Sequence, residues 1–307
     1  MPSGLVSRAK TRRTVAARTP LGRSIVVGTV GDASSTAAVR VAHLLAARDG
    51  GEVRAIAAVA PFPHAAVTSF SITPPPLMDE ENRRATLASV ARQLRELGAT
   101  EASARAVMGW PSEAVVTAAN ERNASLIVVG LGHHRAIDRL LGHETAVSIA
   151  RHATVPVLAV TARCTALPER VLVGIDFTES SRRAAELAAR LIQPAGEIVL
   201  AHVPPFAAFQ RKGGGESWVD VYMTGAEDRL EEERAMLAER TGRRVRALLA
   251  NGEPGEQLLK LARKMCCDTI AVGAHAQGFV DRVLLGSIAT RVLRAASCSV
   301  LVAPRWR

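Results

Sequence analysis

The sequence predicts an α/β protein made of two tandem doubly wound domains, each a five-stranded parallel sheet with helices on both faces. Three observations support this prediction. The chain has 307 residues, which is the length of two ordinary domains. Short apolar runs alternate with helical patterns, as in parallel sheets that are covered on both faces. Residues 130–139 also align without gaps with residues 273–282, at an offset of 143 (273 − 130).

The repeat extends beyond this block, so a whole domain is duplicated rather than a short solenoid unit. Residues 157–158 match 300–301 at the same offset, whereas residues 25–28 match 171–174 at an offset of 146. We expect four parts along the chain: a disordered basic arm over residues 1–22, a first domain over 23–162, a linker over 163–169 and a second domain over 170–305.

The elements of the second half can be assigned in chain order. The apolar run 171–176 predicts a strand, and the alanine-rich segment 181–192 predicts a helix that stops at Pro194. Strand 198–203 precedes a long loop and a charged amphipathic helix over 226–240. Strand 245–250, helix 256–266, strand 269–273, helix 288–295 and strand 299–303 follow. The first half repeats this order, with strands over 25–30, 53–59, 103–107, 126–130 and 156–160.

Composition favours a cytoplasmic protein without a membrane span. Hydrophobic residues make up 48% of the chain, yet no apolar run approaches 18 residues, and the basic N-terminus lacks the apolar core of a secretory signal. The four cysteines have no C-x-x-C spacing, so we expect reduced thiols. The clustered histidines match no familiar ligand spacing, so we expect no metal site at His133, His134, His143 and His152.

The net charge of +10 raises nucleic acid as a partner, but the distribution of charge disfavours this reading. Residues 1–23 contain six basic residues and no acid, so six of the ten excess charges lie in the arm and at the residue that follows it. Aromatic residues make up only 3% of the chain, too few for base stacking. We interpret the arm as a solvated segment, and contact of the arm with nucleic acid or an anionic membrane is the alternative.

The most informative motif follows the apolar run 269–272. Gly273-Ala-His-Ala276 is separated by nine residues from Gly286-Ser287, which opens a helical pattern. A glycine turn before a helix N-terminus suits phosphate binding, because unpaired N–H groups and the helix dipole favour an anion there. Ligands of open parallel sheets sit beyond the carboxyl ends of the strands, and both Asp176 and Gly273 lie at such ends. We therefore expect a site between the first and fourth strands of the second half.

These motifs resemble the universal stress protein family, in two copies that cover residues 23–304. The segment 171–181 is similar to the family's first strand and turn, residues 273–287 to its ATP signature Gly-x2-Gly-x9-Gly-Ser/Thr, and residues 298–302 to its last strand. The resemblance implies a fold of the adenine nucleotide alpha hydrolase type. It also implies domains paired edge to edge through their last strands, and ATP, with or without Mg²⁺, as a ligand of some members.

The resemblance also implies a set of ligand contacts in the second half. Asp176 and Val203 correspond to residues at the adenine end. The ribose and phosphate path corresponds to Gly273, Ala276, Gly286, Ser287 and Ile288, with Gly174, Ile175 and Val272 beside the site. Ala276 departs from the signature glycine, and its methyl group restricts the backbone and can reduce affinity.

The first half departs much further from the signature. In the alignment, Asp176, Ala276, Gly286 and Ser287 are replaced by Val30, His133, His143 and Glu144. Valine cannot accept a hydrogen bond from adenine, the histidine adds bulk, and the glutamate puts a negative charge where a phosphate would sit. We therefore expect nucleotide to bind in the second half alone.

We predict an adenine-nucleotide-binding regulatory protein of the stress response, with one competent site and an unidentified protein partner. We predict no enzyme, because no nucleophile is paired with a general base and neither Gly-x-Ser-x-Gly nor a lysine-bearing phosphate loop is present. A nucleotide-free interaction scaffold and a slow ATPase are the alternatives. The two domains are expected to pair within the chain, which leaves a homodimer of chains open.

Overall fold

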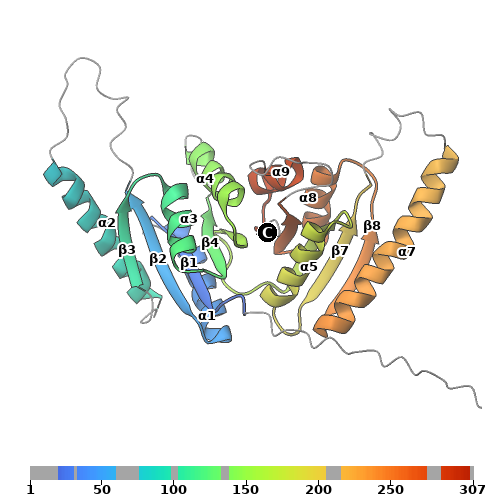
Figure 1. The fold of residues 1–307 in the computed structure, drawn as a ribbon, viewed down its shortest axis with the longest axis horizontal. Coiled ribbons are helices and arrows are strands. Elements are labelled where there is room, and N and C mark those ends of the chain that lie inside the picture. Colours follow the sequence, from blue (N-terminus) through green and yellow to red (C-terminus); the bar gives the residue numbers. More distant parts are fainter. Residues whose placement is uncertain are drawn as a thin grey trace, which may run out of the picture.

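The computed structural model describes residues 20–30, 33–59, 76–97, 103–132, 138–204, 216–274 and 285–304. Its strands form one ten-stranded sheet in the order β3-β2-β1-β4-β5-β10-β9-β6-β7-β8 (Figure 1). Each half contributes five parallel strands in the order 3-2-1-4-5, as the alternating pattern predicts. The two halves therefore share the predicted doubly wound fold.

The elements of the first half are β1 (Ser24–Gly28), α1 (Ala33–Asp49), β2 (Glu52–Val59), α2 (Pro76–Glu96), β3 (Ser103–Met108), α3 (Pro111–Glu121), β4 (Leu126–Leu131), α4 (Asp138–His152) and β5 (Val157–Thr161). Those of the second half are β6 (Arg170–Ile175), α5 (Glu179–Leu191), β7 (Glu197–His202), α7 (Glu216–Thr241), β8 (Arg244–Leu249), α8 (Pro254–Lys264), β9 (Thr269–Gly273), α9 (Ser287–Ala295) and β10 (Ser299–Ala303).

Helices cover the sheet on both faces. The buried side chains of α1, α2, α5 and α7 form one core with the sheet, and those of α3, α4, α8 and α9 form the other. The central strands are buried along their whole length, as in β5 and β10. Their continuous apolar sequences follow from this burial, because both faces of the strand pack against helices.

The two halves meet along an antiparallel pair of last strands, β5 and β10, which we call the seam. Val157 pairs with Val302, Leu158 with Leu301, and Ala159 with Val300. The repeat offset of 143 relates Val157 to Val300 and Leu158 to Leu301, so the pairing has a local two-fold symmetry about Leu158 and Leu301. The predicted edge-to-edge pairing is thus confirmed.

Side chains also tie the halves together beside the seam. Arg48, at the end of α1, donates hydrogen bonds to the carbonyl oxygens of Arg190 (2.6 Å) and Leu191 (3.3 Å) at the end of α5. On the other face, Arg294 of α9 pairs with Glu144 of α4, with 2.6 Å between Nη2 and Oε1. A cation near a helix C-terminus is attracted to the carbonyl groups that have no partner within the helix. Both halves therefore hold a defined relative position.

Two expectations change in the structure. Leu21 is only 1% exposed and the Gly22 amide donates to the Asp49 carboxylate (2.8 Å), so the packed first half begins before residue 23. Residues 1–19 of the expected arm lie outside the described residues. The helix expected over 226–240 begins ten residues earlier, at Glu216. Gly225 weakens the helical pattern there, but helix α7 continues through it.

Candidate functional site

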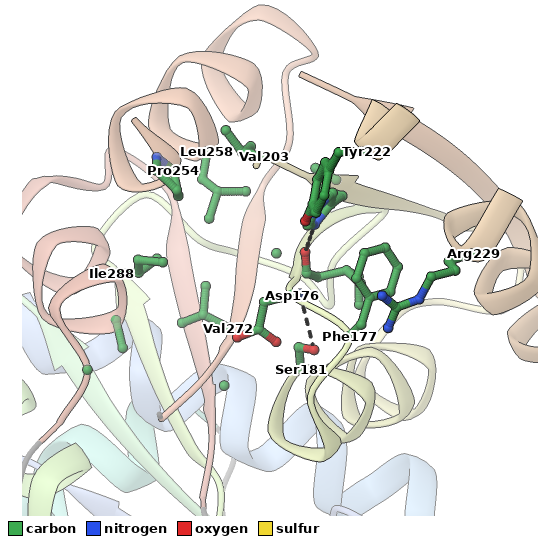
Figure 2. A pocket seen from close by; sticks show the side chains of 17 residues that line it. Asp176, Phe177, Ser181, Val203, Tyr222, Arg229, Pro254, Leu258, Val272 and Ile288 are labelled. Atoms are coloured by element: carbon green, nitrogen blue, oxygen red, sulfur yellow. Dashed lines mark hydrogen bonds between the residues drawn. The ribbon is translucent and has the colours of Figure 1, made fainter. Parts of the chain in front are cut away.

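The candidate site lies at the carboxyl ends of β6 and β9. These strands are neighbours in the sheet, with Val171 paired to Thr269 and Val173 to Ala271. The chain leaves β6 toward α5 and β9 toward α9, whose buried side chains lie in opposite cores, so a crevice is expected at this switch point. A cavity of about 430 Å³ lies there (Figure 2). Its size falls within the usual range for small-molecule sites.

The cavity gathers most of the residues that the sequence singled out. It is lined by Gly174, Ile175, Asp176, Val203, Val272, Gly273, Gly286 and Ile288, which are eight of the ten predicted residues. Ser287 is exposed and follows Gly286 but is not part of the lining, and Ala276 lies outside the described residues. The structure adds further lining residues that sequence reasoning missed: Phe177, Ser181, Ala201, His202, Tyr222, Arg229, Pro254, Leu258 and Ala289.

Gly273 is needed because β9 ends directly against the start of α5. A Cβ atom on Gly273 would lie 2.9 Å from Ser180 Cβ and 3.0 Å from the Ser180 backbone carbonyl carbon. Ser180 Oγ is buried and has no hydrogen-bond partner in the described part of the chain. The glycine therefore allows the close approach of strand and helix that shapes the floor of the cavity.

The N-terminus of α9 forms the other wall of the cavity. Its N-cap is Gly286, with φ −57° and ψ 150°, and no side chain caps the helix. The Gly286 amide donates to the Ala274 carbonyl oxygen (2.7 Å), which fixes the entry to the helix. The first N–H groups of a helix have no intrahelical partner, and the helix dipole makes this end positive. This wall can therefore accept an anionic group.

The turn after β6 holds Asp176 in a fixed position. Asp176 Oδ1 accepts hydrogen bonds from the Thr178 amide (3.1 Å) and hydroxyl (2.5 Å), and Thr178 in turn caps α5 by accepting from the Ser181 amide. Phe177 adopts a left-handed φ of 61°, a strained conformation that costs about 1–3 kcal/mol for a bulky residue. Such strain persists where the surrounding packing holds it, and the Phe177 side chain is buried.

An aromatic wall from β7 and α7 surrounds Phe177 (Figure 2). Its ring lies 4.5 Å from the His202 ring, centroid to centroid, and the Arg229 guanidinium carbon lies 4.2 Å from the Phe177 centroid. Cations are attracted to aromatic faces in this geometry. The residues of this wall come from a turn, the end of a strand and a helix, which lie far apart in the sequence. Among them, only His202 could have been found from the sequence, because it directly precedes the predicted residue Val203.

His202 is neutral in this wall and its tautomer is fixed. Burial is the main cause that lowers the pKa of His202. Because a carbonyl oxygen can only accept, Nδ1 carries the proton and donates to the Ile175 oxygen (2.6 Å). Nε2 is then an acceptor and receives the Tyr222 hydroxyl hydrogen (3.3 Å). His202 and Tyr222 therefore present neutral, hydrogen-bonded groups to the cavity, and Arg229 adds a positive charge to the same wall.

The corresponding end of β1 in the first half is built differently. Val30 replaces Asp176 and is 57% exposed. Beside it, Thr29, Ser35 and Gln93 are buried and hydrogen-bonded to one another, with 2.7 Å between the hydroxyls and 2.8 Å from Thr29 to the Gln93 amide oxygen. Glu144 lies two turns inside α4, where it pairs with Arg294. The expected role of Glu144 as a charge facing phosphate is therefore replaced by a contact between the halves.

The described residues contain no group of three or more histidine, cysteine, aspartate or glutamate side chains that could hold a metal ion. His133 and His134 lie outside them. Among the helices within the described ranges, none is both long and apolar enough to cross a membrane.

A family model supplies the deciding comparison. The model of the universal stress protein family matches residues 22–161 and again residues 168–304. The chain belongs to the universal stress protein family. The two matches fall on the two halves of the sheet, so this universal stress protein carries the family domain twice.

Individual relatives agree with this assignment. A universal stress protein of Mycolicibacterium smegmatis is 29% identical over 206 residues, which are 59% of this chain and 62% of that protein. One of Methanocaldococcus jannaschii is 28% identical over 130 residues, 42% of this chain and 76% of that protein. The crystal structure of a universal stress protein from Archaeoglobus fulgidus has a TM-score of 0.61 and 20% identity, and covers 92% of this chain and 97% of its own. That last likeness shows the tandem fold.

Proposed function

We propose that this universal stress protein binds one adenine nucleotide, ATP in the first place, in the cavity of its second half. The observation that carries the proposal is the cavity itself. Residues chosen from sequence at the ends of two strands and at the start of α9 line one space of about 430 Å³. We expect the base beside Asp176 and Val203 and the phosphates at the N-terminus of α9.

The chemistry of the walls supports this orientation. The part of the cavity between Val203, Leu258 and Val272 is apolar and suits a planar base (Figure 2). The uncapped start of α9 offers N–H donors to phosphate oxygens. Asp176 is the only carboxylate among the described lining residues, so we expect phosphate oxygens rather than a protein cage to hold any Mg²⁺.

The two halves differ in the residues that would contact a nucleotide. In the first half, exposed Val30 offers no acceptor for a base, and the buried network of Thr29, Ser35 and Gln93 lies at the end of β1. We therefore propose a single competent site per chain, in the second half. The first half then acts as the structural partner that covers the edge of the second sheet.

Family membership supports a regulatory role in the stress response, in which bound nucleotide changes the surface offered to a protein partner. We propose no turnover, because both candidate bases in the described lining are engaged: Asp176 accepts from Thr178, and His202 Nε2 accepts from the Tyr222 hydroxyl. A nucleotide-free scaffold is the second candidate, favoured by the contacts that fix the two halves beside the seam, which are the Arg48 hydrogen bonds and the ion pair between Glu144 and Arg294.

The proposal is tested by isothermal calorimetry of the full chain with ATP, together with mass spectrometry of any ligand released from freshly purified protein. We expect about one site per chain. Asp176→Ala should weaken binding, whereas Ser35→Ala in the first half should leave the stoichiometry and affinity unchanged. Two equal sites per chain would contradict the asymmetry, and absence of binding would favour the scaffold.

A further inference from the structure

The two-fold symmetry of the seam relates contacts between the halves in pairs. A residue of α4 or β5 that touches the other half has an equivalent 143 residues further along the chain, which faces the equivalent of its partner. Helices α4 and α9 lie on the same face of the sheet, on either side of the seam (Figure 1). The residues that form one contact of such a pair therefore indicate which residues, or which ligand, form the symmetry-related contact.

The visible member of one pair is the ion pair between Glu144 and Arg294. Arg294 Nε and Nη2 lie 2.9 Å and 2.6 Å from Glu144 Oε1, and both side chains are about half exposed. Adding 143 to 144 gives Ser287, and subtracting 143 from 294 gives Arg151. The symmetry therefore sets Arg151, in the last turn of α4, opposite Ser287 at the start of α9.

The second member of the pair lacks its anion. Ser287 has a hydroxyl where Glu144 has a carboxylate, and it begins the helix whose N-terminus has no side-chain cap. The Arg151 side chain is exposed and, within the described ranges, makes no hydrogen bond or ion pair. The symmetry of the seam thus sets an arginine without an acid opposite the helix N-terminus that borders the cavity.

We propose that Arg151, supplied by the first half, binds the terminal phosphate of the nucleotide held by the second half. This inference rests on the proposed function. Glu144 shows where an anion sits between these helices, and a phosphate would take the corresponding place beside Ser287. Arginine suits this contact because its planar guanidinium can donate two hydrogen bonds to phosphate oxygens. The ligand class is therefore a nucleotide with a chain of phosphates rather than a nucleoside.

The affinity test compares ATP and adenosine on the full chain. Arg151→Gln should weaken ATP binding by about tenfold or more, the usual effect of losing a hydrogen bond to a charged group, and should leave adenosine binding unchanged. Arg294→Gln is the matched control, since it removes the other arginine of the pair and should leave ATP affinity unchanged. Equal ATP affinity in Arg151→Gln and the parent would overturn the proposal, as would equal losses in both variants.

A second measurement needs no nucleotide. Ser287→Glu places a carboxylate at the position equivalent to Glu144, so it should pair with Arg151 and raise the melting temperature more in the parent than in the Arg151→Gln variant. Additive effects of the two changes would show that Arg151 does not face residue 287, and would overturn the inference. If the parent binds no ATP, the proposed function is wrong. A non-additive effect of Ser287→Glu and Arg151→Gln on the melting temperature would still show that Arg151 pairs with an anion at position 287.

Discussion

Replacing Gly273 with alanine should destabilise the second half and weaken nucleotide binding together. The added Cβ would lie 2.9 Å from Ser180 Cβ and 3.0 Å from the Ser180 carbonyl carbon. The carbonyl carbon belongs to the backbone of α5, so rotation of a side chain cannot relieve the contact. Strand β9 and helix α5 must separate by several tenths of an ångström, and the floor of the cavity moves with them.

The expected magnitude follows from overpacking of a close-packed interior. Such insertions cost about 1–3 kcal/mol of unfolding free energy. For domains of this size, a loss of about 2 kcal/mol lowers the melting temperature by about 4–8 °C. The atom nearest to the added Cβ is the buried, unpartnered Ser180 Oγ, so Ser180→Ala removes one of three close contacts. It should rescue the alanine variant only in part, because the contacts with the Ser180 Cβ and carbonyl carbon remain.

The assay is urea denaturation of the full chain followed by circular dichroism, with ATP titration of the folded variant. Gly225→Ala is the matched control. Gly225 lies inside α7 with open space around it, so alanine there should stabilise the helix by about 0.5–1 kcal/mol. If Gly273→Ala were as stable as the parent and bound ATP equally well, the close approach of β9 and α5 would not be a requirement of the site.

Three further outcomes are expected. Gly286→Glu should leave the fold intact, because φ −57° suits any residue and a helix N-terminus tolerates a carboxylate. It should weaken ATP binding by about tenfold or more, because the carboxylate repels phosphate. Unchanged affinity by calorimetry would place the phosphates elsewhere. Residues 166–307 alone should dimerise or aggregate in size-exclusion chromatography, because β10 loses its partner β5, and a stable monomer at high concentration would contradict this. Burial lowers the pKa of His202 and His43, so on acidification these side chains take up protons at a higher pH in the unfolded chain than in the folded one. The free energy of unfolding should therefore be highest above about pH 6.5 and fall as the pH drops below it. His202→Gln should reduce this dependence on pH in denaturation curves.

Most of the fold could be predicted because its determinants are local and repeated. The run 171–174 is apolar at every position up to Gly174. Such a continuous apolar run is typical of a strand that is buried on both faces, and the structure places it in β6. Apart from the start of α7, which lies ten residues earlier than expected, element ends were displaced by a residue or two, as where β6 ends at Ile175 rather than Asp176. Asp176 instead begins a turn that its own carboxylate stabilises.

The aromatic wall of the site could not be predicted for a physical reason. Phe177 points inward only because its backbone adopts a left-handed conformation, which sequence patterns do not favour for phenylalanine. Tyr222 and Arg229 reach the cavity from α7, whose position depends on its packing against α5 and β8. Glu144 aligns with Ser287 in the sequence, but its ion pair with Arg294 could not be predicted, because it depends on how the two halves meet.

Joining the two halves in one polypeptide frees them from a constraint that identical subunits obey. In a dimer of identical chains every substitution occurs on both sides of the axis, so a glutamate introduced at one position of the interface would be introduced at both. Here Glu144 occurs once, opposite Arg294, while Ser287 keeps the other side open. Covalent fusion therefore lets one molecule combine a permanent internal counter-ion with a second position, at Ser287, which we propose an exchangeable anion fills.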